Sequence, residues 1–364
     1  MTLDLADYDF SLPEELVAKT PASPRDSARL MVVDTKAGKV CVDVFRNLHR
    51  YLPATSLMVL NRTKVVPARV TLYKETGGKV VALFLLNEPR GGTTTRALLD
   101  RGVARNASLY LSKVKRTHRF IVAGQEKNAF SLKPEFDIRH LPKLLEHYGT
   151  TPIPPYLRDT PLSERKLRER YQTVFAREAG SVAAPTASLH FTPRVFMALT
   201  NKGIERAFIT LHVGLGTFAP IGAENFVSGK LHEERYEMSH HSLERISRAK
   251  REGRPVVAVG TTSVRTLETV APEILANTYD RRYLLKAERR GVFGTADLFI
   301  YPPYEFKIAD ALITNFHVPR SSLMCLVDAF LEHKKSAVRI PELYRLAMKE
   351  RMRFFSFGDA MLIV

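Results

Sequence analysis

The chain contains no tryptophan and only two cysteines among its 364 residues. Cys41 and Cys325 lie far apart and have no metal-site spacing, so we expect two buried thiols in a reducing compartment. No hydrophobic run approaches the length of a membrane span, and the first residues are acidic, unlike those of a signal peptide. These absences argue against a zinc site and a membrane location, and they predict a cytoplasmic protein.

Acidic residues are also few relative to basic ones. The 38 Asp and Glu residues face 55 Lys and Arg residues, which gives a formal net charge of +17 at pH 7. Such an excess favours a polyanionic partner, most often nucleic acid, although a charged surface that only improves solubility is the alternative. The length exceeds what one small core needs and indicates two domains, or one domain with a large insertion.

The sequence pattern changes twice along the chain. Residues 1–64 and 151–364 alternate short apolar strands with helical patterns, which predicts a discontinuous α/β domain. Residues 65–150 instead contain short strands between Gly-, Asn- and Lys-rich turns, which is typical of a small antiparallel β-barrel. We therefore predict an α/β main domain, a three-layer α/β/α sandwich, with an inserted barrel domain. The expected strands are 28–34, 39–45, 57–60, 80–86, 108–111, 119–123, 129–132, 204–213, 256–259, 298–301 and 311–314, and the expected helices are 140–148, 163–170, 193–201, 242–252, 322–332 and 341–351.

A basic cluster falls inside the predicted barrel. It consists of Lys113, Lys115, Arg116 and Arg119. Such clusters are usually the solvated face of a strand. In a cationic chain, they also fit contacts with a nucleic-acid backbone.

The stretch 171–192 has the composition of a ligand-binding loop. It places adjacent Arg177 and Glu178 before small residues around Pro185, and His190 follows. Small residues let the backbone approach a ligand closely, while the polar side chains supply charges and a titratable ring. An ordinary loop between a strand and a helix explains the same composition equally well.

A second candidate lies at 256–268, where an apolar strand runs into Gly260 and then a helix. We expect Thr262 or Ser263 to cap that helix, whose first amides would form an anion site near Arg265. An ordinary strand-to-helix connection is the alternative. Further polar groups occur in three other segments: His212, Gly214 and Gly216 before a turn, His232 and Glu234 in 230–236, and Asn315 and His317 in 312–322.

Together these motifs resemble those of the S-adenosylmethionine:tRNA ribosyltransferase-isomerases of queuosine biosynthesis. The segments that carry the resemblance are PRDSARL at 24–30, AREAGSVAAPTASLHFT at 176–192, LHVGLGTF at 211–218, GTTSVRTLE at 260–268, LITNFHVPRSS at 312–322 and RFFSFGD at 353–359. The chain departs from the family at Arg62, Lys64, Ala179, Ser188 and Glu233. Ser188 replaces a Gly that could hold a positive φ.

The resemblance implies an enzyme, a monomer or a loose dimer, whose α/β main domain is catalytic and which transfers and isomerises the ribosyl group of S-adenosylmethionine. The acceptor is 7-aminomethyl-7-deazaguanine at the wobble position of tRNA, and the products are epoxyqueuosine-tRNA, adenine and methionine. It implies no metal or redox cofactor, since S-adenosylmethionine is a substrate. The basic barrel cluster would contact tRNA. A related enzyme with a different acceptor and a non-catalytic tRNA-binding protein are the alternatives.

The resemblance also supplies candidate roles. His190 and His317 are base and acid candidates, Glu178 and Glu234 would hold the sulfonium or the amine, and Arg265 would hold the methionine carboxylate. Arg25 and Arg177 would hold that carboxylate or an RNA phosphate. The remaining substrate-binding candidates are Thr186, His212, Gly214, Gly216, His232, Thr261, Thr262, Asn315 and Asp359.

Overall fold

The structure is a computed structural model, and it describes residues 4–86, 93–114, 116–126, 128–214, 221–276 and 291–364. Its largest element is a nine-stranded mixed sheet with the order β15-β13-β12-β3-β14-β16-β17-β1-β2. The strands of this sheet are β1 (Arg29–Asp34), β2 (Lys39–Val44), β3 (Leu57–Asn61), β12 (Glu205–Leu211), β13 (Lys230–Met238), β14 (Val256–Val259), β15 (Val292–Leu298), β16 (Ala311–Asn315) and β17 (Ala360–Ile363).

The middle of the sheet is parallel. Strands β12, β3, β14 and β16 run in one direction, so their carboxyl ends meet at the same edge. Strands β17 and β13 pair antiparallel with the outer members of this group. In open sheets of this kind, ligands bind at the edge where the carboxyl ends of the parallel strands lie.

Alternation along the strands builds a core on each face of the sheet. In β3, Leu57 and Val59 pack on one face, while Met58 and Leu60 pack on the other. Residues of β14 alternate in the same way, as expected for strands buried on both sides.

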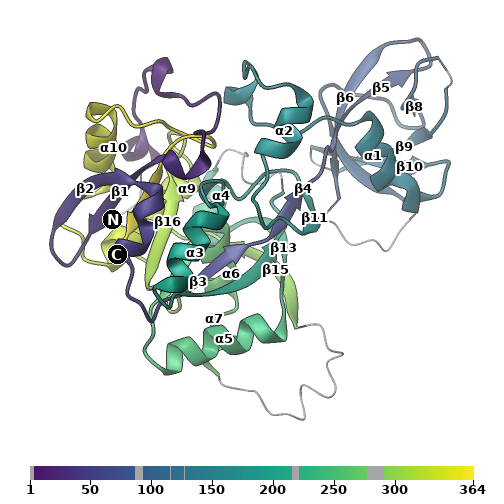
Figure 1. Ribbon diagram of the computed structural model, residues 1–364. Coiled ribbons are helices and arrows are strands. Elements are labelled where there is room, and N and C mark those ends of the chain that lie inside the picture. Colours follow the sequence, from purple (N-terminus) through teal and green to yellow (C-terminus); the bar gives the residue numbers. More distant parts are fainter. Residues whose placement is uncertain (1–3, 87–92, 115, 127, 215–220, 277–290) are drawn as a thin grey trace.

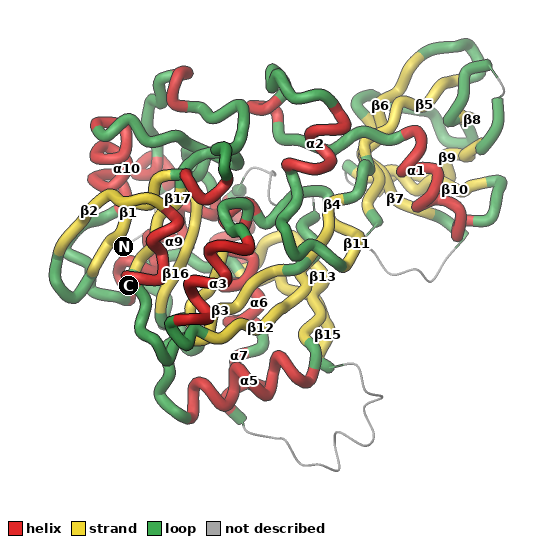
Figure 2. The backbone as a smooth tube through the Cα atoms, viewed as in Figure 1, coloured by secondary structure: helices red, strands yellow, loops and turns green. Residues whose placement is uncertain are grey.

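Helices cover both of these faces (Figures 1 and 2). One layer contains α3 (Pro193–Asn201) and the 3₁₀ segment η4 (Phe45–Tyr51), and the other contains α5 (His240–Arg251), α6 (Thr261–Thr269), α7 (Ala271–Leu275), α9 (Ser322–His333) and α10 (Ile340–Lys349). This is the predicted three-layer α/β/α arrangement.

A closed six-stranded barrel is inserted into the sheet unit, as predicted. All its pairs are antiparallel, in the order β10-β7-β6-β5-β8-β9. Its strands are β5 (Arg69–Lys74), β6 (Lys79–Leu85), β7 (Thr95–Leu99), β8 (Ser108–Tyr110), β9 (Arg119–Glu126) and β10 (Ala129–Pro134), and α1 (Leu141–Tyr148) packs on its core. The barrel projects from one side of the sheet unit in Figure 1. The domain boundaries at 64/65 and 150/151 stay a prediction.

Short elements connect the barrel to the sheet unit. Strands β4 (Thr63–Val65) and β11 (Glu178–Ser181) form a parallel two-stranded sheet, and α2 (Glu164–Arg170) precedes β11. The other short segments are η1 (Leu5–Tyr8), η2 (Glu14–Leu16), η3 (Arg25–Ser27), η5 (Ile138–His140), η6 (Pro155–Leu157), η7 (Thr186–Ser188) and α4 (Ala223–Ser228).

Two predictions about local structure are wrong. The strand expected over 298–301 is the end of β15, and the chain leaves the sheet after Leu298. Cys325 is buried as expected, whereas Cys41 is exposed, because its position in β2 lies at the edge of the sheet. The strands that the prediction missed are β4, β5, β7, β11, β13, β15 and β17. In β13, charged residues alternate with buried ones at a period of two, which is the pattern of a strand near a sheet edge.

Candidate active site

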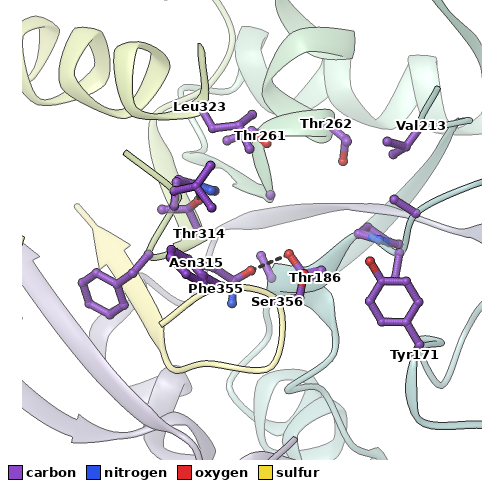
Figure 3. A pocket seen from close by; sticks show the side chains of 18 of the residues that line it. Tyr171, Thr186, Val213, Thr261, Thr262, Thr314, Asn315, Leu323, Phe355 and Ser356 are labelled. Atoms are coloured by element: carbon purple, nitrogen blue, oxygen red, sulfur yellow. Dashed lines mark hydrogen bonds between the residues drawn. The ribbon is translucent and has the colours of Figure 1, made fainter. Parts of the chain in front are cut away.

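A pocket lies at the carboxyl ends of β14 and β16 (Figure 3). Its walls come from the loop before η7, the start of α6, the loop after β16 and the aromatic segment before β17. The residues that line it are Tyr156, Tyr171, Ala183, Ala184, Pro185, Thr186, Ala187, Val213, Gly260, Thr261, Thr262, Thr314, Asn315, Phe316, His317, Val318, Leu323, Phe355 and Ser356. Five predicted site residues therefore meet here: Thr186, Thr261, Thr262, Asn315 and His317.

The backbone of Gly260 brings α6 to the pocket. Its φ of 85° lies in the left-handed region, where a side chain would add strain, and it lets β14 turn directly into the helix. The expected hydroxyl cap is wrong, because Gly260 is the N-cap residue and no side chain caps the helix. The Ser263 hydroxyl instead donates to the Val259 carbonyl at 2.8 Å, and Asn61 Nδ2 donates to Thr262 Oγ1 at 3.3 Å.

Asn315 organises the wall that η7 and β16 share. Thr186 Oγ1 donates to Asn315 Oδ1 at 2.7 Å, as the dashed line in Figure 3 shows. Asn315 Nδ2 lies 3.4 Å from His190 Nε2 and 3.3 Å from the Asp359 carbonyl. His190 is therefore a buried residue behind the wall, and it contacts the pocket through Asn315.

The carboxylate of Asp359 has a structural role next to this wall. It accepts hydrogen bonds from the backbone amides of Arg29 and Arg353 at 3.0 and 2.8 Å, and the Arg353 guanidinium lies 3.3 Å away. The carboxylate thus fixes the turn before β17, from which the Asp359 carbonyl reaches Asn315.

Both candidate histidines are neutral at pH 7. Burial lowers the pKa of His317 to about 3. Burial also lowers the pKa of His190 to about 3, with smaller contributions from the charges of Arg353 and Arg25. His317 Nε2 lies 2.7 Å from Thr314 Oγ1, and the His317 backbone amide donates to the Tyr344 hydroxyl at 2.7 Å. His317 is thus a firmly held neutral imidazole on the pocket wall.

Glu234 and Arg265 form a buried ion pair beside the pocket. Arg265 Nη1 lies 2.5 Å from Glu234 Oε2, and the two side chains are 8% and 1% exposed. The other carboxylate oxygen accepts the Gly214 amide at 2.9 Å, and Arg265 Nη2 donates to the Ala296 carbonyl at 3.0 Å. The pair therefore ties α6 to β13, β15 and the loop after β12. His232 is exposed beside it, in a small hollow that Arg265 and Leu323 share.

Glu178 and His212 form a third group, next to β4. Thr63 Oγ1 lies 2.8 Å from His212 Nδ1, and burial lowers the pKa of His212, as does the charge of Arg235 to a smaller degree. Glu178 lies 3.6 Å from Arg62 and 3.7 Å from Arg177.

Asn61 connects this third group to the pocket. Its Oδ1 accepts the Thr63 amide at 3.1 Å, and its Nδ2 donates to Thr262 Oγ1. The pocket, the ion pair and the group around His212 thus lie along one edge of the sheet.

Other predicted residues lie elsewhere. Arg25 donates to the Gln172 and Glu169 carbonyls, so its guanidinium anchors the segment after α2. Arg177 is largely exposed. Gly216 and Lys115 lie outside the described residues. Lys113 and Arg116 are exposed on the barrel, whereas Arg119 donates to Ser108 Oγ at 3.0 Å and pairs with Glu135 at 3.2 Å.

Sequence reasoning missed Tyr156, Tyr171 and Ser356, which line the pocket. Tyr156 follows two prolines and looks like part of a linker, while Ser356 stands among three phenylalanines that look like core residues. The signal that could have identified these residues is the hydroxyl group that each of them carries inside an otherwise apolar segment. Ser188 lies in the 3₁₀ turn η7 without a positive φ, so the expected backbone strain is absent.

The described residues contain no group of three or more His, Cys, Asp or Glu side chains that could hold a metal ion. None of the helices that the structure describes is long and apolar enough to span a membrane.

Comparison with known proteins decides the family. The model of the family described as "Queuosine biosynthesis protein" matches residues 5–363. The chain belongs to this family. It is 41% identical over 374 residues to the S-adenosylmethionine:tRNA ribosyltransferase-isomerase of Carboxydothermus hydrogenoformans, with full coverage of both chains. It is 42% identical over 364 residues to the protein of that name from Thermosipho melanesiensis, covering 99% of this chain and 100% of the relative.

A solved structure supports the same assignment. It is the crystal structure of S-adenosylmethionine tRNA ribosyltransferase from Thermotoga maritima, which is 32% identical in sequence. The match has a TM-score of 0.52 and covers 98% of this chain and 100% of the other. The queuosine biosynthesis family membership therefore extends over the sheet unit and the barrel alike.

Proposed function

We propose that this chain transfers and isomerises the ribosyl moiety of S-adenosylmethionine onto 7-aminomethyl-7-deazaguanine at the wobble position of tRNA. The products are epoxyqueuosine-tRNA, adenine and methionine. The observation that carries the proposal is the pocket itself: residues from three family-like motifs, around Thr186, Thr262 and His317, meet there in one space. The full-length relatives named above bear the name of this reaction.

The neutral histidines fit the first step of such a reaction. The sulfonium of S-adenosylmethionine acidifies the C5′ protons of its ribose, so a positioned base can remove one of them. His317 lies on the pocket wall with its ring held by Thr314, and it is the proposed base. His190 acts through Asn315 and is the proposed positioning residue. Both imidazoles are neutral at pH 7, and the proton that His317 takes from C5′ is then available for the departing adenine.

The charged candidates divide into a buried pair and an exposed pair. Glu234 and Arg265 neutralise each other and hold the Gly214 amide, so their proposed role is to shape the loop after β12. Glu178 and Arg177 lie on β11 and just before it, with side chains 41% and 77% exposed. We assign the cationic sulfonium or the acceptor amine to Glu178 and the methionine carboxylate or an RNA phosphate to Arg177.

Transfer RNA would bind across the basic barrel. Lys113 and Arg116 carry exposed charges there, as contacts with phosphates require. The proposed protein is a cytoplasmic monomer that needs no metal or redox cofactor. Its proposed domain boundaries lie at 64/65 and 150/151.

Adenine release tests this function directly. The purified protein is incubated with S-adenosylmethionine and tRNA that carries 7-aminomethyl-7-deazaguanine, or with unmodified tRNA, and adenine is measured by chromatography. We expect adenine only with the modified tRNA, and a loss of at least 100-fold in His317→Ala. Tyr8→Phe is the control, because Tyr8 is buried against Asp328, outside the pocket lining. A folded protein that releases no adenine with modified tRNA would refute the proposal.

A further inference from the structure

The pocket differs from the rest of this cationic chain in one respect: no described residue that lines it carries a charged side chain. Seven of the lining residues have a hydroxyl group, namely Tyr156, Tyr171, Thr186, Thr261, Thr262, Thr314 and Ser356. Most of the others are apolar. Moving a charged group into such surroundings is costly unless a partner charge goes with it. A neutral ligand with several hydrogen-bonding atoms is therefore the better match.

One wall is formed by two tyrosines and a serine. Tyr156 Oη lies 2.8 Å from Ser356 Oγ. Burial raises the pKa of Tyr156 to about 12 and raises that of Tyr171 as well, so both phenols keep their protons at pH 7. Figure 3 shows the Tyr171 hydroxyl turned toward the interior of the pocket. This wall presents neutral groups that can both donate and accept hydrogen bonds.

A second part of the lining presents groups that are already oriented. The Thr186 hydroxyl is fixed by Asn315, and the Thr314 hydroxyl by His317. A hydroxyl that donates one hydrogen bond keeps acceptor capacity, so Thr186 can still accept one from a ligand. The space between the walls, including its open mouth, is about 750 Å³.

We infer that this pocket binds the neutral adenosine half of S-adenosylmethionine, with Tyr156, Tyr171 and Ser356 as recognition residues for its ribose or purine. Ribose hydroxyls and purine nitrogens offer donors and acceptors without charge, which matches both walls. The charged methionine half then lies outside the hydroxyl-lined space. This inference rests on the proposed function, and it specifies which half of the substrate the pocket recognises.

Binding measurements without tRNA test the inference. The probe is S-adenosylmethionine, displaced from the full-length protein by adenosine or by methionine and followed by calorimetry. We expect adenosine to compete with it and methionine to compete much more weakly. Each of Tyr156→Phe, Tyr171→Phe and Ser356→Ala removes one hydroxyl and should weaken adenosine binding about 3- to 10-fold, the value of one hydrogen bond.

Controls separate recognition from damage to the fold. Tyr8→Phe removes a buried tyrosine hydroxyl that donates to Asp328 at 3.0 Å outside the pocket lining, and it should leave the affinity for adenosine unchanged. Circular dichroism checks that each variant is folded. If one pocket variant unfolds, Thr262→Val serves in its place, since it removes another pocket hydroxyl while preserving the shape of the side chain.

The inference and the proposed function fail in different ways. The inference is overturned if adenosine does not compete at millimolar concentration, or if it binds equally well to the wild type and to all the pocket variants. The proposed function still stands in either case if the wild type releases adenine. The opposite result is also possible to recognise. If adenosine competes in a way that depends on these hydroxyls, but the protein transfers nothing to modified tRNA, the inference is supported and the proposed function is overturned.

Discussion

The pocket at the sheet edge and the barrel handle charge in opposite ways. Side chains of the described pocket lining are neutral, and the buried Glu234 and Arg265 beside the pocket neutralise each other. The barrel instead exposes cations such as Lys113 and Arg116 to solvent. The barrel thus presents solvated positive charge, as the proposed contact with tRNA requires, whereas the pocket suits a neutral group in a poorly solvated space. Four experiments can break or sharpen this contrast.

The largest effect is expected from splitting the buried ion pair. Glu234→Ala leaves the Arg265 guanidinium buried without its carboxylate, which should reduce the free energy of unfolding by about 3–5 kcal/mol. Denaturant unfolding measures this loss. The double variant Glu234→Met/Arg265→Met should lose less than Glu234→Ala, because it leaves no uncompensated charge. A loss below about 1 kcal/mol in Glu234→Ala would show that the pair is not desolvated.

A second effect concerns acid stability. The folded pKa of His190, about 3, lies below the unfolded value near 6.5, so the unfolded chain binds the proton first as the pH falls. The stability that neutral His190 contributes is present above pH 6.5 and is lost toward pH 3, at roughly 1.4 kcal/mol per pH unit.

His190→Asn removes this contribution. Between pH 7 and pH 5, the variant should lose about 2 kcal/mol less of its unfolding free energy than the wild type. Urea unfolding at both pH values gives the comparison. Parallel pH curves for the two proteins would contradict the assignment of a depressed pKa to this residue.

A third effect contrasts cations on the barrel. Replacing Lys113 and Arg116 with alanine should lower the slope of log affinity for tRNA against log salt by about 1.5, if each contacts a phosphate. Arg119→Ala is the matched control, since Arg119 is held by Ser108 and Glu135 and should change the slope less. Fluorescence titration at several salt concentrations measures the slope. Adenosine binding should be insensitive to salt, and equal slopes for all variants would remove these residues from RNA binding.

The smallest effect should follow from an exposed ion pair beside the barrel. Arg139 and Asp137 lie 2.5 Å apart, but the Arg139 side chain is 86% exposed. Because solvent screens such pairs, Asp137→Asn should leave the melting temperature within error of the wild type. A clear decrease would mean that exposed and buried pairs contribute alike in this protein, against the contrast drawn above.

Sequence patterns predicted the larger features because those depend on periodicity. The barrel, the central strands and most helices follow from short-range sequence patterns, such as the apolar run of β14 and the helical spacing of apolar residues in α3. Strand β15 at the sheet edge and its neighbour β13 were missed because polar and charged residues break up their apolar runs, and pairing with each other and with β12 holds them in the sheet.

The site was only partly predictable for a similar reason. Family-like motifs identified Asn315 and His317, which line the pocket. A motif does not show how deeply a residue is buried, and His190 lies behind Asn315 rather than on the pocket surface. The pairing of Arg265 with Glu234 joins residues 31 positions apart, which no local pattern shows. Tyr156 and Ser356, 200 positions apart, meet only after the chain has folded.

The base of the barrel has a consequence for how this protein can change. Arg69 and Thr150 exchange backbone hydrogen bonds of 3.3 and 2.8 Å, so the chain leaves and re-enters the rest of the molecule at neighbouring points. A short loop could join these points without moving the sheet. The insertion can therefore be exchanged or enlarged during evolution as a separate module, while the sheet and the pocket at its edge keep their structure.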